Sequence, residues 1–161
     1  METFLQQAKD VIEKIKYLNI ASISSEGFPW NTPVYTSYDK NLNFYWLSWK
    51  KNQHSQNIEH NPQVFITIYD SSVPEGTGFG VYFQGKASRV IDPTEILIGL
   101  KSHYSRANSK MRAVEKFIKK FPRRVYKFTP EKAWVNGDAE IEGEPIDTRV
   151  ELNLEKLKSL F

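Results

Sequence analysis

The sequence predicts an α+β fold that is mainly β: a small antiparallel β-barrel of six strands with helices attached. Three observations support this prediction. Short alternating or aromatic stretches separated by turn residues fill residues 19–90, a helical pattern precedes them, and a second helical region separates them from a last strand. The length of 161 residues is that of one ordinary domain, so we expect a single domain over residues 1–161.

An N-terminal helix is predicted by apolar residues that recur at helical spacing. This spacing would place them on one face of an amphipathic helix that packs against the rest of the domain. The residues are Phe4, Leu5, Ala8, Val11, Ile12, Ile15 and Leu18.

Five strands are expected next, joined by short connections rich in turn residues. Gly85 lies inside the fifth strand and indicates a bulge or a close approach of another backbone. In order, the strand segments read IASIS, PWNTPVYTSY, LNFYWLS, QVFITIYD and VYFQGKASRV.

Two helices are expected before the last strand. Asp92 followed by Pro93 is a typical helix start and predicts a helix over residues 94–106. Apolar residues on one face, with basic residues on the other, predict a second helix over residues 109–121.

The sixth strand is predicted from the segment RRVYKFTPEKAWV, in which Pro130 requires an edge or a bend. The residues after Trp134 read as a polar tail, and Glu140 and Glu142 are expected to be solvated there. A short terminal helix over residues 154–161 is weakly signalled.

Composition limits the classes of function. The chain has no cysteine, which excludes disulfides, thiolate catalysis and cysteine-ligated metals. A hydrophobic content of 40% excludes a disordered chain, and no apolar run approaches the ~20 residues needed to cross a bilayer. The N-terminus has no secretory signal pattern, so we expect a cytoplasmic protein without membrane contact.

Charge is unevenly distributed along the chain. Between Lys101 and Lys127 there are ten Lys or Arg residues against one acid, whereas residues 131–161 contain eight acids and four bases. This asymmetry fits a basic face for nucleic acid, or two oppositely charged surfaces, within one subunit or between two, that attract each other. Since basic faces are frequently solubilising, we do not expect nucleic-acid binding.

The segment from Phe44 to Pro62 is the strongest candidate for a binding site. An aromatic strand is followed at once by hydroxyl, ammonium, imidazole and amide donors, which suit phosphate oxygens. A helical turn starting near Ser55 would add backbone N–H groups to the same anion site. The alternative is an aromatic strand that fills the core, followed by a solvated loop, and this segment by itself does not decide between the two.

Other site types have weaker support. The GTGFG segment lacks the spacing of a phosphate loop and joins two strands, so we interpret it as a flexible connection. His54 and His60 do not have the spacing of zinc hydrolases, and we expect no metal site. No residue has the pattern of a catalytic acid, base or nucleophile.

Four segments in order resemble the FMN-binding split barrels related to pyridoxamine 5'-phosphate oxidase, especially the small general-stress-protein-like branch. The segments are IASISSEGFPWNTPVY, FYWLSWKKNQHSQNIEHNP, VYFQGKA and VYKFTPEKAWV. The resemblance implies a split barrel with Greek-key connections, bound FMN, and a homodimer with two flavin sites at its interface.

The resemblance also implies roles for particular residues. The second strand would lie along the isoalloxazine edge with Asn31, Thr32, Val34, Tyr35 and Thr36, and Tyr45, Trp46, Leu47 and Ser48 would lie beside the ring. The phosphate would be bound by His54, Ser55 and Asn57, with Lys50 or Lys51 supplying charge, and Trp134 would reach the flavin from the partner subunit.

His54 departs from the family pattern, because relatives often have Lys or Arg at its position. An imidazole there makes phosphate binding more sensitive to pH.

The segment after Trp134 contains Arg149 but no histidine, whereas true pyridoxamine phosphate oxidases use both residues on their substrate. We therefore expect an FMN-dependent oxidoreductase of another kind, using reduced nicotinamide or another donor on a small molecule. The alternative is a non-enzymatic flavin carrier or stress-linked sensor. Heme-degrading relatives are harder to exclude, but none of the three histidines has a pattern that requires heme.

Overall fold

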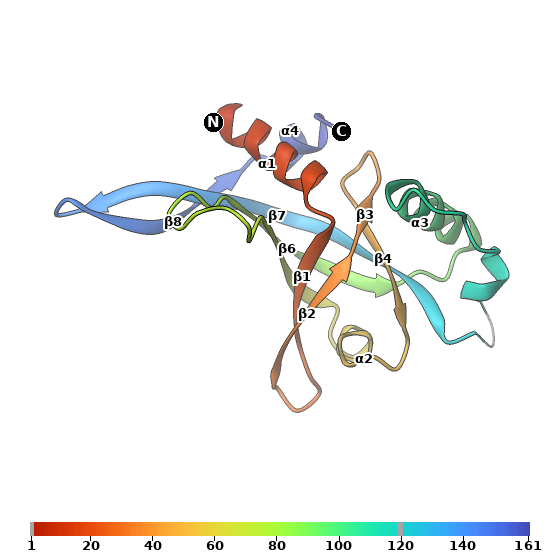
Figure 1. Ribbon diagram of the computed structural model, residues 1–161. Coiled ribbons are helices and arrows are strands. Elements are labelled where there is room, and N and C mark those ends of the chain that lie inside the picture. The colour runs from red at the N-terminus through yellow and green to blue at the C-terminus, as the bar shows by residue number, and fades with distance from the viewer. Residues whose placement is uncertain (1, 119–120) are drawn as a thin grey trace.

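The computed structural model describes residues 2–118 and 121–161. An antiparallel sheet of eight strands curls into a half-barrel and is flanked by four α-helices, which confirms the predicted fold class (Figure 1). The strand order is β2-β1-β5-β6-β7-β4-β3, and β8 pairs with β7. The strands are β1 (Tyr17–Ile23), β2 (Pro29–Tyr35), β3 (Ser37–Tyr38), β4 (Phe44–Trp49), β5 (Gln63–Tyr69), β6 (Gly80–Arg89), β7 (Arg123–Ile141) and β8 (Glu144–Leu152).

The helices cover the openings and one outer side of the half-barrel. Helices α1 and α4 pack beside each other, α2 packs against β1, β2 and β6, and α3 packs against β3, β4 and β7 (Figure 1). None of the described helices is long and apolar enough to cross a bilayer. The helices are α1 (Glu2–Lys14), α2 (Gln53–His60), α3 (Pro93–Arg106), the 3₁₀ turn η1 (Val114–Phe117) and α4 (Leu154–Lys158).

Helix α1 ends at Lys14, so its predicted continuation to Leu18 is wrong: Leu18 is buried in the core from β1. At this end the guanidinium of Arg106, on α3, donates hydrogen bonds to the carbonyls of Ile12 (2.6 Å) and Ile15 (2.7 Å). These contacts satisfy backbone acceptors that a helix C-terminus leaves unpaired.

The bulge predicted at Gly85 is present. The register between β6 and β7 shifts between Gln84 and Gly85, and Pro130 lies opposite Gly85. A Cβ atom at Gly85 would lie 2.2 Å from the carbonyl oxygen of Thr129, so this backbone approach requires glycine. Pro130 is tolerated because residues 129–132 of β7 pair with neither β4 nor β8, which leaves that edge of β7 open there.

The polar tail expected after Trp134 is wrong, as is the count of six strands. Strand β7 continues to Ile141, turns through Glu142 and Gly143 with φ values of 54° and 85°, and returns as β8. Two consecutive residues with positive φ are typical of a tight two-residue hairpin turn. Past Gly137 the hairpin extends beyond the barrel (Figure 1), so the described residues there do not show the apolar alternation that reveals a half-buried strand. The second added strand arises because the segment 29–38 is broken at Thr36 into β2 and β3.

The helix predicted over residues 109–121 is also wrong for the part of it that the structure describes. The short turn η1 replaces it, and Phe117 is buried against β4, β7 and α3 with Val114 and Ile118 at its side, whereas Met111 and Phe121 are exposed. Residues 119–120 of the predicted helix lie outside the described residues.

Candidate functional site

A buried polar network joins helix α2 to strands β1 and β4. The Nε2 atom of His54 lies 2.8 Å from the hydroxyl of Ser48, and the side-chain amide of Asn52 donates to the same hydroxyl at 2.9 Å. On the next face of the helix, Asn57 donates to Ser22 at 3.0 Å. The helical turn predicted near Ser55 is therefore confirmed, and its position is fixed from two strands.

The N-terminus of α2 is open to an anion. Asn52 occupies the N-cap position, but its side chain makes no capping bond and is turned toward Ser48 instead. The first N–H groups of the helix therefore have no side-chain acceptor, and the helix dipole makes this end positive. Such an end is suited to a phosphate group.

The three residues predicted to bind phosphate lie below the surface. His54 is 4% exposed, Ser55 0% and Asn57 1%. Ser55 lies beside the hydroxyl of Tyr126, although the two groups do not reach hydrogen-bond geometry. The exposed donors next to the helix start are Lys50 and Lys51, so direct phosphate contact by the buried residues stays a prediction.

Arg124 is a cation of this region that the sequence interpretation missed. It lies on β7 directly opposite Ser48 in the register of β4 and β7, and its side chain is largely buried. Its guanidinium donates to the carbonyl oxygens of Phe121 and Arg123. The sequence did not distinguish Arg124 from the other Lys and Arg residues around it, because its burial follows from the pairing of β4 with β7.

The four predicted residues of β4 divide between two faces, as strand geometry requires. Trp46 and Ser48 point into the barrel, where Trp46 stacks on Tyr126 with ring centroids 5.7 Å apart. Tyr45 and Leu47 point to the opposite side, toward α3 and η1. The four side chains therefore cannot contact one ring from the same side.

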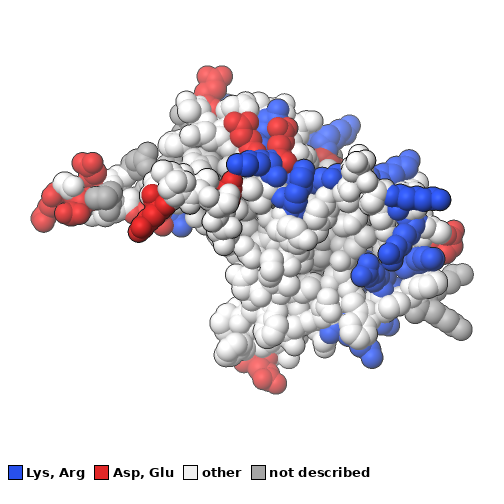
Figure 2. Space-filling view, viewed as in Figure 1, with Lys and Arg blue, Asp and Glu red and all other residues white. Residues whose placement is uncertain are grey.

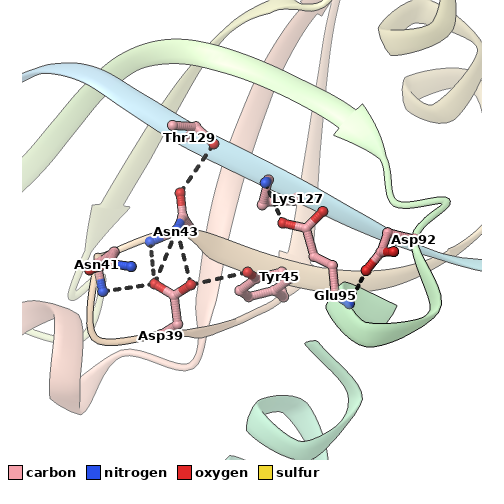
Figure 3. Close-up of polar contacts among 8 residues, drawn as sticks. All are labelled: Asp39, Asn41, Asn43, Tyr45, Asp92, Glu95, Lys127 and Thr129. Atoms are coloured by element: carbon pink, nitrogen blue, oxygen red, sulfur yellow. Dashed lines mark hydrogen bonds and ion pairs between the residues drawn. The ribbon is translucent and has the colours of Figure 1, made fainter. Parts of the chain in front are cut away.

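A polar network fixes the outer face of this strand (Figure 3). The carboxylate of Asp39 accepts hydrogen bonds from the backbone N–H of Asn41, from Asn43 and, at 3.0 Å, from the hydroxyl of Tyr45. Burial, followed by the charge of Asp39, raises the pKa of Tyr45 far above its ordinary range. Tyr45 therefore stays a neutral donor.

The same view shows how α3 is attached to the sheet (Figure 3). Asp92 caps α3 by accepting from the N–H of Glu95 at 2.8 Å, and the carboxylate of Glu95 pairs with Lys127 on β7. These contacts hold α3 over Tyr45 and Leu47.

The residues predicted on β2 line the edge of the sheet. Asn31 is exposed, Thr32, Val34 and Tyr35 are half-buried, and Thr36 is buried with its hydroxyl donating to the carbonyl of Tyr45 at 3.1 Å. Thr36 thus connects β2 to β4 where the half-barrel is open.

A groove of about 500 Å³ begins at the Asn31 end of β2. It is lined on one side by Trp30 and Asn31 and on the other by Phe65 and Gln84, and Ser22 connects it to Asn57 of α2. The volume falls in the usual range for small-molecule sites, and aromatic walls with a few amides are typical of them.

Trp134 lies on the same sheet face as this groove. Its ring stacks on Phe65 with centroids 6.1 Å apart. The structure therefore places Trp134 next to Phe65, which lines the groove.

Comparisons with known proteins now identify the family. The family model described as pyridoxamine 5'-phosphate oxidase matches residues 4–137. The chain belongs to this family. No curated protein matches the sequence.

Solved structures share the fold of this pyridoxamine 5'-phosphate oxidase family member. A heme binding protein from Mycobacterium smegmatis is 16% identical with a TM-score of 0.73, over 97% of this chain and 60% of that chain. A Clostridium acetobutylicum protein related to general stress protein 26 is 12% identical with a TM-score of 0.64, over 98% and 99%. An F420 reductase is 19% identical with a TM-score of 0.57, over 78% and 94%. At these identities the similarity concerns the fold.

Arg149, the one arginine of the segment after Trp134, is held by contacts within the subunit. Its guanidinium pairs with Asp147 at 2.5 Å and lies over the ring of Tyr82, 4.2 Å from the centroid. Among the described residues, no group of three or more His, Asp or Glu side chains could hold a metal ion.

Acid is expected to destabilise this family member through the buried His54 and the half-buried His103. Burial lowers the pKa of His54, and burial followed by the charge of Arg123 lowers the pKa of His103. Since the unfolded chain binds protons first, stability is full above pH ~6.5 and falls as the pH drops toward the lowered pKa values, by up to roughly 2 kcal/mol per histidine at pH 5. Urea unfolding at pH 5, 6, 7 and 8 measures this loss.

His54→Gln should remove the share of His54 from that pH dependence. His60→Gln is the matched control, because His60 is exposed at the end of the same helix. A pH dependence that is the same in wild type and His54→Gln would contradict the assignment.

Proposed function

We propose that this protein is an FMN-binding oxidoreductase that works as a homodimer on a small molecule and does not oxidise pyridoxamine phosphate. The observation that carries the proposal is the uncapped, positive start of α2, which lies next to the Ser48–His54 pair and Arg124 in a member of this family. It offers several donors to one phosphate group.

The residues present fit FMN in two parts. The phosphate would lie at the start of α2, where backbone N–H groups are free and Lys50, Lys51 and Arg124 supply positive charge. His54 would hold Ser48 and the start of the helix in place through the 2.8 Å contact between its Nε2 atom and the Ser48 hydroxyl. The ring would lie along β2, whose open edge offers backbone donors and acceptors from residues 31–36.

Bound FMN would supply reversible hydride transfer, and the chain would supply binding, orientation and exclusion of water. None of the described side chains at the site is arranged as a proton-transfer pair with an exposed partner. We therefore assign no catalytic residue, and we expect reduced nicotinamide or another donor to reduce the flavin directly.

A second copy of the chain would complete the site. The outer face of β1 and β5 exposes the aromatic rings of Tyr17, Phe65 and Tyr69. Extended apolar patches are rare on monomers, and symmetric dimers are the commonest way to cover them. The groove between β2 and β5 is open on this face, so a partner would provide its missing wall, including the partner's Trp134.

Pyridoxamine phosphate is disfavoured as the substrate because Arg149 is already paired with Asp147 and packed on Tyr82. The segment after Trp134 contains no histidine that could assist it.

The first test is the cofactor content of the purified protein. We expect a yellow protein that releases FMN on denaturation and rebinds it. Because relatives of the same fold are named for heme and for F420, titrations with heme and F420 run in parallel. Tight heme or F420 binding without FMN binding would overturn the proposal. Anaerobic reduction by NADH or NADPH, followed by an acceptor screen, separates an oxidoreductase from a flavin carrier or sensor, which would show no turnover.

Replacing His54 and Asn57 together with alanine is expected to weaken FMN binding roughly 10- to 100-fold, because charge-assisted hydrogen bonds are worth ~1.5–3 kcal/mol. Riboflavin lacks the phosphate and should bind with little change. Fluorescence titration of wild type and variant with both ligands measures the loss of affinity for each.

Glu59→Gln, at the exposed far end of α2, is the control and should leave both affinities unchanged. Equal losses for FMN and riboflavin would show that the two residues act on the fold and not on the phosphate.

A further inference from the structure

The β7–β8 hairpin forms an arm that carries a concentrated negative charge at its tip. Residues 139–144, here called the acidic tip, include Glu140, Glu142 and Glu144, all exposed, around an Ile141 that is 59% exposed. The tip lies well outside the barrel, and the acidic side chains gather there (Figures 1 and 2). None of the three glutamates makes an ion pair within the described residues.

The opposite end of the molecule is basic. Lysine and arginine side chains gather over α3 and the segment that follows it (Figure 2). This basic face comprises Lys101, Lys110, Arg112, Lys116 and Arg123, against the single acid Glu115. In the part of the chain that the structure describes, none of these five cations has an ion-pair partner.

The basic face is also hollowed. A depression of about 680 Å³ lies between α3 and the following segment, with Lys101 and Lys110 at its border. Tyr104 and Met111 contribute apolar surface to its lining. Ser105, Asn108 and Ser109 line it as well, so the hollow offers mixed polar and apolar surface between two ammonium groups. Its positive charge is complementary to the carboxylates on either side of Ile141.

The two surfaces cannot meet within one subunit. They lie at opposite ends of the molecule (Figures 1 and 2). The two strands of the arm are paired with each other along its whole length, from the barrel to the tip, so the arm cannot fold back. Exposed charges interact over about 10 Å at ordinary salt, so neither surface neutralises the other in a monomer.

We propose that the acidic tip of one copy of this chain docks on the basic face of a second copy. Ile141 enters the partner's hollow, and the glutamates on either side face the lysines that border it. A two-fold axis perpendicular to the long direction of the molecule places each arm over the basic end of its partner, so the contact forms twice. The proposal rests on the self-association described above and does not depend on FMN.

The test is a pair of charge reversals. The arm variant carries Glu140→Lys, Glu142→Lys and Glu144→Lys, and the face variant carries Lys101→Glu, Lys110→Glu and Arg112→Glu. Each is expected to raise the dimer dissociation constant roughly 10-fold or more at low salt, since it turns attractive contacts into repulsive ones at two symmetric sites. Sedimentation of dilution series at low and high salt measures the constant.

Mixing the two variants provides a rescue. The arm variant has a basic tip and a basic face, and the face variant has an acidic tip and an acidic face, so a mixed dimer regains both contacts. Native mass spectrometry should show more mixed dimer than either homodimer. Since all six positions are exposed, circular dichroism should show unchanged folding of both variants. Glu142→Asn keeps the turn while removing its charge, and it should weaken the dimer less than the triple reversal does.

The outcomes separate this proposal from the preceding one. A wild-type dimer that binds FMN, whose dissociation constant neither reversal changes, would overturn the docking of the arm and leave the proposed function standing. A wild type that binds FMN but stays monomeric would overturn the arm and the dimer together. If face reversal abolishes binding of a DNA or RNA oligonucleotide and leaves the dimer intact, the basic face is a nucleic-acid surface and the arm proposal fails.

Discussion

Replacing Gly85 with alanine is expected to destabilise the fold by about 3 kcal/mol, at the upper end of what overpacking usually costs. The added Cβ would lie 2.2 Å from the carbonyl oxygen of Thr129 and 2.8 Å from the ring of Phe128. The first neighbour is backbone in a strand that is paired through the bulge, so it cannot move aside without breaking the pairing of β6 with β7. Urea unfolding at neutral pH measures the change in the free energy of unfolding.

Gly78→Ala is the matched control, because a Cβ at Gly78 has no neighbour closer than 4.0 Å. Its stability should remain within about 0.5 kcal/mol of wild type, as for most exposed positions. If Gly85→Ala were equally harmless, the close approach across the bulge would be incorrect.

Phe117→Ala is expected to cost about 3–5 kcal/mol, the usual range for truncating a buried phenylalanine. Phe117 is 2% exposed and belongs to a small second core with Tyr45, Leu100 and Val125. This core lies between α3 and the outer faces of β4 and β7, so its loss would also loosen the segment that borders the basic face. Thermal unfolding and hydrogen exchange of the α3 amides measure the two effects.

Phe121→Ala provides the comparison within the same segment. Phe121 is 46% exposed, and its contribution to the site is a carbonyl oxygen, which the substitution retains. The two substitutions distinguish the observed η1 turn from a continuous helix over residues 109–121. In such a helix Phe117 and Phe121 would share one buried face, so both substitutions would lower stability strongly.

The barrel could be predicted from sequence because its strands alternate and its turns carry glycine, asparagine or aspartate. Strand β5 shows the rule most clearly: Val64, Ile66 and Ile68 face the core while the intervening residues face outward. Gly85 and Pro130 also helped the prediction, since each is tolerated in a sheet only at a special backbone position.

The arm and the η1 turn could not be predicted, for opposite physical reasons. Beyond Gly137 the described residues of the arm have no buried face, so this part of its strands carries no periodic signal. Backbone pairing with polar cross-strand contacts supports it. The segment 109–121 does carry helical spacing, but packing of Phe117 and Ile118 against α3 overrides it. The candidate site shows a similar limit, because the inward direction of Arg124 depends on its register with Ser48.

Strand β7 has a consequence for the order in which the chain folds. It pairs with β4 over residues 123–128, with β6 over 126–135 and with β8 over 133–141, so three ladders depend on it. Because β7 begins at residue 123, a chain emerging from the ribosome exposes unpaired edges of β4 and β6 until most of it has been made. Contacts of such wide sequence separation are associated with slow folding. We expect refolding to be slow, with nascent chains shorter than β7 prone to aggregation.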